Sequence, residues 1–167
     1  MRPSVFLLLL VLACKPAVVD DASNTERTDY STLILQDSKT TLIGEAQKKA
    51  LKWQAFQDLL TGLENYDHSI ATTNSLISHV DKMLENPKES FQDQSITSRI
   101  KVLKTRLHIY KSYLGYRIKT KEAQELKYNY ITIALDELTL QINLRVNQLE
   151  KSNEQLLKEL KEGLDPE

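Results

Sequence analysis

Apolar residues recur along most of this chain at alternating steps of three and four, the spacing of one face of an α-helix. The first seam of this kind runs from Phe56 to Leu84 through Ile70 and Thr73. We expect one helix that starts near Leu42 and ends at Asn86-Pro87, because the residue before a proline avoids the helical region. The same 4-3 spacing sustained over several heptads is typical of helices that pack as in a coiled coil.

Two further seams follow. Ser95 is a predicted N-cap for a helix whose apolar positions are Ile96, Ile100, Leu103, Leu107, Tyr110 and Leu114, with Gly115 near its end. The longest seam comprises Ile131, Leu135, Leu138, Ile142, Val146, Leu149, Asn153, Leu156 and Leu160. A second apolar face on the same helix, formed by Ile133, Leu140 and Leu144, stops at Asn147. We therefore expect the middle of this helix to be buried more broadly than its end.

The junction between the second and third seams contains no proline, and its last glycine is Gly115. We predict a turn near Lys119-Thr120-Lys121, with Thr120 as the N-cap of the third helix. The alternative is one continuous helix of about 65 residues, close to 97 Å long at 1.5 Å per residue. The turn predicts an all-α, elongated three-helix up-down-up bundle with coiled-coil-like packing. The continuous helix would give a long two-helix hairpin that leaves apolar surface for a partner.

The N-terminal segment has the pattern of an export signal. Arg2 is followed by an uninterrupted apolar run from Val5 to Leu12, too short for the roughly 20 residues that span a bilayer. Val11-Leu12-Ala13-Cys14 resembles the lipobox of bacterial lipoproteins, in which the cysteine is lipidated and becomes the mature N-terminus. The resemblance implies a signal peptide at 1–13 and a bilayer anchor through acylated Cys14. Lys15, rather than an aspartate, favours the outer membrane.

Residues 14–40 then form a predicted lipidated, flexible tether, because they are mostly polar and show no periodicity apart from Leu33-Ile34-Leu35. Residues 41–167 form the predicted helical bundle domain. The composition agrees with such a domain: 41% hydrophobic and 27% charged residues exclude a disordered chain and a polytopic membrane protein. With 4 glycines and 4 prolines, the sequence lacks the turn residues that a β-sandwich or a Rossmann-like sheet requires.

Charge is sorted by helix although the formal net charge is only −1, a balance that argues against a nucleic-acid partner. The stretch between Asp93 and Glu122 contains no acidic residue, whereas the flanking helices are acidic. This basic helix can pair internally with its neighbours, which would select register more than stability. The alternative is a face that binds an anion or a partner, with the candidate residues Arg99, Lys101, Lys104, Arg106, Lys111, Tyr113, Tyr116 and Arg117.

The sequence contains no nucleotide-binding, serine-hydrolase or zinc-protease motif. Glu64 and His68 have the spacing of one helix face, and with Asp67 they could hold one metal ion, but the Glu-x-x-His pairs of di-iron bundles are absent. We predict that the chain is not an enzyme and that it uses no metal and no cofactor. No catalytic residue is proposed.

The predicted body also resembles the small, uncharacterised, all-helical lipoproteins of Bacteroidota-type bacteria. The resemblance rests on three amphipathic stretches, Leu51-Lys52-Trp53-Gln54-Ala55-Phe56, Ser98-Arg99-Ile100-Lys101-Val102-Leu103-Lys104-Thr105 and Leu138-Thr139-Leu140-Gln141-Ile142-Asn143. It implies a lipid-anchored protein of the cell envelope, facing the periplasm or the cell surface, and supplies no activity. Two functions are open: a structural or interaction module for an envelope protein, or a chaperone-like protein that binds anionic polymer or unfolded chains.

Overall fold

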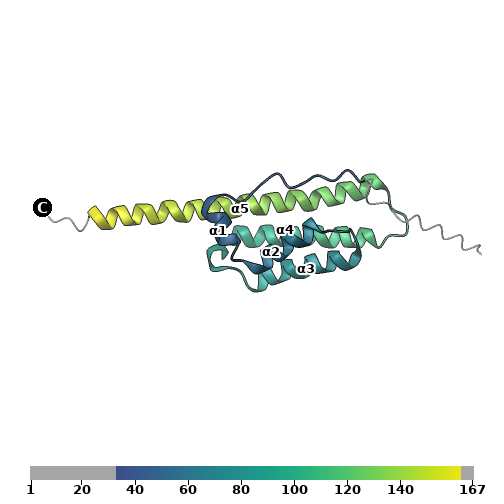
Figure 1. Ribbon diagram of the computed structural model, residues 1–167, viewed down its shortest axis with the longest axis horizontal. Coiled ribbons are helices and arrows are strands. Elements are labelled where there is room, and N and C mark those ends of the chain that lie inside the picture. The colour runs from purple at the N-terminus through teal and green to yellow at the C-terminus, as the bar shows by residue number, and fades with distance from the viewer. Residues whose placement is uncertain (1–32, 163–167) are drawn as a thin grey trace, which may run out of the picture.

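The computed structural model describes residues 33–162, and in this part of the chain the protein is all-α, with five α-helices packed in sequence order. The all-α part of the predicted fold class is confirmed. The predicted signal peptide, Cys14 and the predicted tether up to residue 32 lie outside the described residues. The elements are α1 (Gly44–Ala50), α2 (Gln54–Glu64), α3 (Ile70–Glu85), the short 3₁₀ helix η2 (Glu89–Phe91), α4 (Gln94–Leu114) and α5 (Lys121–Glu162) (Figure 1).

The prediction of one helix from near Leu42 to Asn86 is wrong, because three helices, α1, α2 and α3, occupy this stretch. The seam spacing continues across residues 65–69, but local hydrogen bonds stop the helix there. The Asp67 carboxylate accepts from the Ser69 N–H at 2.9 Å, and the Ser69 hydroxyl caps α3 by accepting from the Thr72 N–H at 3.0 Å. Such side-chain-to-backbone bonds offer the chain an alternative to the helix. Ile70, a predicted core position, begins α3 and is 42% exposed.

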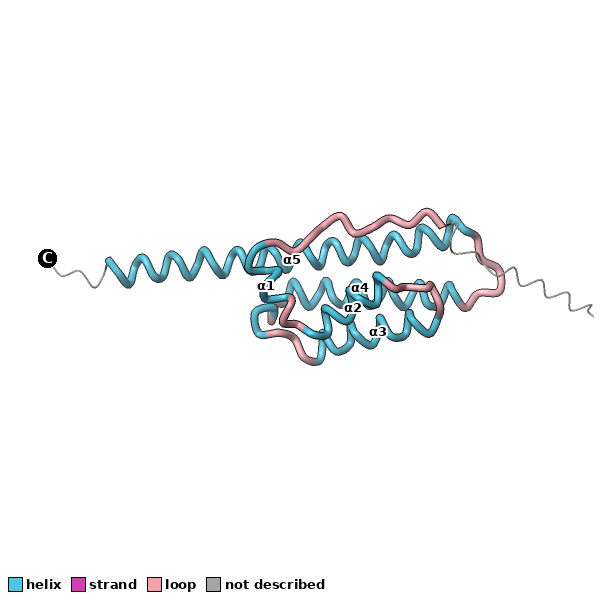
Figure 2. Tube along the Cα trace, viewed as in Figure 1, coloured by secondary structure: helices cyan, strands magenta, loops and turns pink. Residues whose placement is uncertain are grey.

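The break turns α2 and α3 into an antiparallel hairpin that packs on α4 (Figure 2). The hairpin is tight: a Cβ on Gly62 of α2 would lie 2.8 Å from Cδ2 of Leu76 on α3. The predicted count of three helices in an up-down-up bundle is therefore also wrong. α4 nevertheless occupies the predicted middle position, with α3 on one side and α5 on the other.

The predicted turn before the longest helix is confirmed, which excludes the two-helix hairpin. Thr120 caps α5 by accepting from the Ala123 N–H at 3.3 Å. The buried Tyr113 hydroxyl fixes the same turn: it accepts from the Thr120 N–H at 2.8 Å and donates to the Thr120 carbonyl at 3.0 Å. The ammonium of Lys119 donates to the Leu114 carbonyl at the end of α4. The turn is thus held by side chains from both helices.

The predicted N-cap of α4, Ser95, lies two residues after the actual one. Asp93, not Ser95, caps this helix, and its carboxylate accepts from the N–H groups of Ser95 at 2.8 Å and Ile96 at 3.3 Å. A carboxylate is the stronger acceptor and also interacts favourably with the helix dipole at this end.

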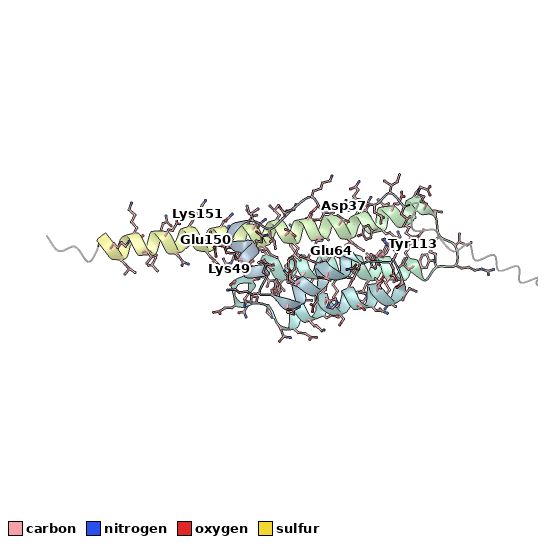
Figure 3. All side chains as sticks on the ribbon, viewed as in Figure 1. Asp37, Lys49, Glu64, Tyr113, Glu150 and Lys151 are labelled. Atoms are coloured by element: carbon pink, nitrogen blue, oxygen red, sulfur yellow. The ribbon has the colours of Figure 1, made fainter. Side chains whose placement is uncertain are left out.

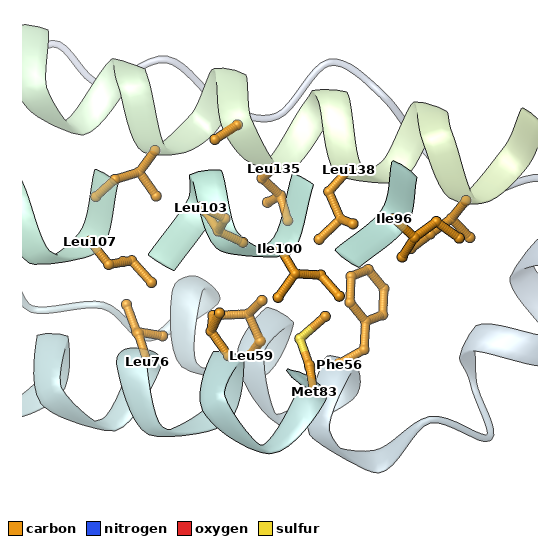
Figure 4. Packing of buried hydrophobic residues seen from close by; sticks show 14 of the residues in the cluster. Phe56, Leu59, Leu76, Met83, Ile96, Ile100, Leu103, Leu107, Leu135 and Leu138 are labelled. Carbon is orange, nitrogen blue, oxygen red and sulfur yellow. The ribbon is translucent and has the colours of Figure 1, made fainter. Parts of the chain in front are cut away.

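The core lies where the 4-3 seams of α4 and α5 meet the α2–α3 hairpin (Figure 4). All six predicted seam residues of α4 are buried, and on α5 the predicted seam is buried from Ile131 through Val146. Trp53 closes one end of the core against Phe91, with 5.1 Å between the ring centroids. The hairpin contributes the side chains Phe56, Leu59, Leu76, Ile77, Val80 and Met83.

Residues 33–43, the strap, lie along α5 in the same direction as the helix (Figure 2). Asp136 accepts from the Ser38 hydroxyl at 2.7 Å and from the Thr40 N–H at 2.8 Å. Asn143 accepts from the Ile43 N–H at 3.1 Å and donates to the Thr41 carbonyl at 2.9 Å. The last residues of the predicted tether, 33–40, therefore belong to the folded body.

The C-terminal part of α5 extends beyond the rest of the body (Figure 1). We call residues 147–162 the overhang; at 1.5 Å per residue it is about 24 Å long. Its seam positions Leu156 and Leu160 are 56% and 54% exposed, in contrast to the fully buried Val146. The longest predicted seam is thus covered for its first five positions and uncovered toward its end.

Candidate functional site

The predicted basic, tyrosine-rich face divides between two edges of α4. Arg99, Arg106 and Tyr113 follow one another at steps of seven and lie on the α5 edge, with the exposed Tyr116 three residues further on. Lys101, Lys104 and Lys111 lie on the α3 edge, because steps of three and seven keep them near one side of the helix. Arg117 follows the end of α4 in the turn. The eight residues therefore do not share one surface.

Several of these side chains have partners within the body. Arg99 forms an ion pair with Glu137 of α5 at 2.7 Å, and Lys104 forms one with Asp81 of α3 at 2.6 Å. Both pairs connect the basic helix to an acidic neighbour, the internal pairing that the charge pattern allows. Tyr113 is buried and holds the turn at Thr120, while the Lys127 ammonium lies 5.0 Å from its ring centroid.

An exposed apolar stripe runs along α5 beside the first of these edges. Its members are Leu126, Tyr130, Ile133, Leu140 and Leu144, which are 41% to 52% exposed. They repeat at 4-3 spacing, and Glu137 occupies the one polar position in the row. We expected Ile133, Leu140 and Leu144 to make the middle of this helix broadly buried, and that expectation is wrong because α4 and the strap cover the other sides of α5. The stripe and the α5 edge of α4 form one surface, which we call the lateral surface.

The lateral surface combines an apolar strip with a border of Arg and Tyr side chains. The Arg106 guanidinium lies over the Tyr130 ring, 5.1 Å from its centroid. Ile109, three residues after Arg106 on α4, is 42% exposed. Tyr116 is 58% exposed near the turn. Arg and aromatic residues around an apolar centre are the composition of protein–protein interfaces.

A cleft of about 440 Å³ opens between the strap, α2 and α5. Its walls are mainly apolar, with Leu60 and Leu63 from α2 and Ile131 and Leu135 from α5. Its polar lining includes Gln36, Asp37, Gln57, Glu64 and Thr132, and Figure 3 labels Asp37 and Glu64 on the strap and α2. The volume is in the range of small-ligand pockets. The sequence did not indicate this cleft, because it depends on the docked strap.

A buried polar network lies beside the cleft, where Tyr128 contributes to both. His68 has a φ of 57°, a left-handed conformation that histidine adopts more readily than most residues, and it shares a 2.8 Å hydrogen bond between Nδ1 and the Tyr110 hydroxyl. The Gln124 amide donates to the same hydroxyl at 3.2 Å. The Tyr66 and Tyr128 rings pack on His68, with centroids 4.5 Å and 5.0 Å away.

Burial sets the protonation of this network. It lowers the pKa of His68 below its usual value of 6.5, although the nearby Asp67 carboxylate acts in the opposite direction. Burial also raises the pKa of Tyr66 and of Tyr128, and the charge of Asp37 adds to the shift at Tyr128. The imidazole and the phenols are therefore neutral near pH 7, which suits a structural hydrogen-bond network.

The described residues offer little for metal chemistry. Glu64 ends α2 whereas His68 lies in the following loop, so the two do not share a helix face as their spacing suggested. Within residues 33–162, no three His, Cys, Asp or Glu side chains gather closely enough to hold a metal ion. In the same part of the chain, no helix combines the length and the apolar character that crossing a membrane requires.

Comparison with known proteins returned no relatives: no family model, no curated protein and no solved structure matches this chain.

Proposed function

We propose that this protein is a membrane-anchored lipoprotein of the bacterial cell envelope that acts as a structural or protein-interaction module. Acylated Cys14 anchors it, with the outer membrane favoured, and residues 15–32 tether a helical body that faces the periplasm or the cell surface. The lateral surface binds an envelope protein. We infer coiled-coil-like packing of α4 on α5, because the buried seam positions of both helices keep 4-3 spacing, apart from one extra step of four between Ile142 and Val146.

The observation that carries this proposal is the exposed apolar stripe of α5. Burying such residues is favourable, and a soluble body that leaves five large apolar side chains about half exposed in one row has an unfilled interface. Arg99 and Arg106 border the row, and their ion pair and ring contact hold them in place before a partner arrives. Preorganised Arg and Tyr side chains lose little conformational freedom on binding.

Photo-crosslinking in cells tests the proposal. A photoreactive amino acid at Leu140 should capture one discrete envelope protein, whereas the same probe at Lys82, an exposed position of α3, should not. The change Leu140→Asp should abolish co-purification of that protein and leave the helical content unchanged. Equal capture at both positions, or capture that survives Leu140→Asp, would contradict the role of the stripe.

A second candidate function rests on a shallow hollow at the turn end of the lateral surface. Tyr113, Tyr116, His108 and Lys127 line it together with Ile109. A cation beside two tyrosines suits an anionic polymer, as a chaperone-like or polymer-binding protein would require. Binding of polyphosphate that weakens with added salt and is lost in Lys127→Gln would favour this function. No binding at low salt would exclude it.

A further inference from the structure

The overhang of α5 presents an apolar seam that the lateral surface does not include. Leu156, Leu157 and Leu160 are 54% to 57% exposed, and every side chain from 151 to 161 is exposed. Glu150 and Lys151, in the first turns of the overhang, are labelled in Figure 3. The seam positions Leu149, Asn153, Leu156 and Leu160 continue the row that α4 covers up to Val146, and from Val146 on they keep regular 3-4 spacing. A surface with this spacing fits another α-helix.

The direction of that helix follows from the body. α4 lies antiparallel to α5, as the ion pairs Arg99–Glu137 and Asp93–Arg145 show, and it begins at Gln94 beside the last buried turns of α5. A second α5 placed parallel on the same seam would bring its residues 121–146 into the space of α4. An antiparallel helix meets no such obstacle, because it extends away from the body beyond residue 162.

We propose that the overhang of a second copy of this chain covers the seam, in an antiparallel, two-fold symmetric pair. The two overhangs have equal length, so each covers the other while the two bodies lie at opposite ends. In the symmetric register, Leu149 of one copy lies opposite Leu160 of the other, and Asn153 lies opposite Leu156. Each contact then occurs twice, as an isologous interface requires.

The charges of the overhang permit self-pairing. Its four glutamates, Glu150, Glu154, Glu159 and Glu162, are nearly balanced by Lys151, Lys158 and Lys161, so two copies repel little. In an antiparallel pair the flanking positions place Glu150 opposite Leu157 and Ser152 opposite Glu159, which opposes no like charges. The two Asn153 side chains lie one turn apart on either side of the two-fold axis. A polar residue at one seam position selects register at a cost in affinity.

The test uses the full chain with Cys14→Ser, which removes the one natural cysteine. Leu149→Cys and Leu160→Cys are introduced in separately tagged copies, mixed and oxidised. The antiparallel pair predicts a disulfide that joins Cys at position 149 of one tagged copy to Cys at position 160 of the other. It also predicts few disulfides between two copies that carry the same tag. Same-tag disulfides of Leu160→Cys without the mixed product would show a parallel pair and overturn the proposal.

Sedimentation equilibrium gives the second measurement. The chain without added cysteines should approach twice its 19.2 kDa at high concentration. Leu156→Asp should return it to a single copy, whereas Gln155→Asp, with the same added charge on the outer side of the overhang, should not. Asn153→Leu should strengthen association. A chain that stays a single copy at every concentration, with native circular dichroism, would overturn the proposal. Crosslinking of an envelope protein at Leu140 tests the proposed function separately, because that position lies on the lateral surface.

Discussion

Leu138 and Leu140 lie two residues apart on α5 and have opposite environments. Leu138 is fully buried in the core, whereas Leu140 is 52% exposed on the lateral surface. Replacing either leucine by alanine removes the same atoms and changes helix propensity by the same small amount. Any difference between the two variants in the free energy of unfolding therefore reports burial.

The structure sets the magnitude of that difference. A buried Leu→Ala change loses transfer free energy and leaves a cavity, so Leu138→Ala should cost about 2–5 kcal/mol. Leu140→Ala leaves no cavity and should cost roughly 1 kcal/mol or less. With a urea dependence near 2 kcal/mol per molar, a loss of about 3 kcal/mol lowers the urea midpoint by about 1.5 M for Leu138→Ala.

Urea titration followed by circular dichroism at one fixed protein concentration measures both midpoints. The fixed concentration keeps any association of copies constant between the variants. Equal midpoints for Leu138→Ala and Leu140→Ala, or a lower midpoint for Leu140→Ala, would refute the assignment of core and lateral surface on α5.

Three further predictions concern other parts of the chain. The pKa of His68 is lowered in the folded protein, so on acidification the unfolded chain binds a proton at this residue before the folded protein does. The free energy of unfolding should therefore fall as the pH drops below about 6.5. His68→Asn should flatten that dependence in denaturation curves measured from pH 5 to 7.5. Gly62→Ala should not show the usual gain of about 1 kcal/mol for this change in a helix, because the new methyl group meets Leu76 in the hairpin; a higher melting temperature would show that Leu76 moves freely aside. Cys14→Ala should abolish metabolic labelling with a radioactive fatty acid, and it should release the protein from membranes or leave the precursor unprocessed. A wild-type protein whose mature N-terminus is another residue without lipid would disprove the anchor.

The sequence was informative where local pattern and packing agree. The seam of α4 predicted six of its seven buried residues, all but Tyr113. The turn at Thr120 could be predicted without a Gly or Pro beside it, because a capping residue lies there between two basic ones. The hairpin was missed because the 4-3 spacing runs across residues 65–69 by coincidence. Asn65, Asp67 and Ser69 were the available signal, since each favours turns and caps over the helix interior.

The candidate site was less predictable. The pattern shows that Ile133, Leu140 and Leu144 share a side of α5, but only the positions of the strap and α4 decide which side stays uncovered. For the basic helix, the sorting of charge by helix indicated pairing with acidic neighbours, and two such pairs are present at Arg99 and Lys104. The cleft and the network at His68 join residues far apart in the chain, so no local pattern indicates them.

The strap also determines how the body resists a mechanical load. Its hydrogen bonds to Glu125, Asn129, Asp136 and Asn143 are spread along α5, and the strap runs in the same direction as the helix. A pull on the chain at Leu33, along the helix axis and away from α1, therefore stretches these bonds in shear, so that they share the force. A pull perpendicular to α5 would break them one after another, at a lower force. The strap is thus held most firmly against a pull along the axis of α5.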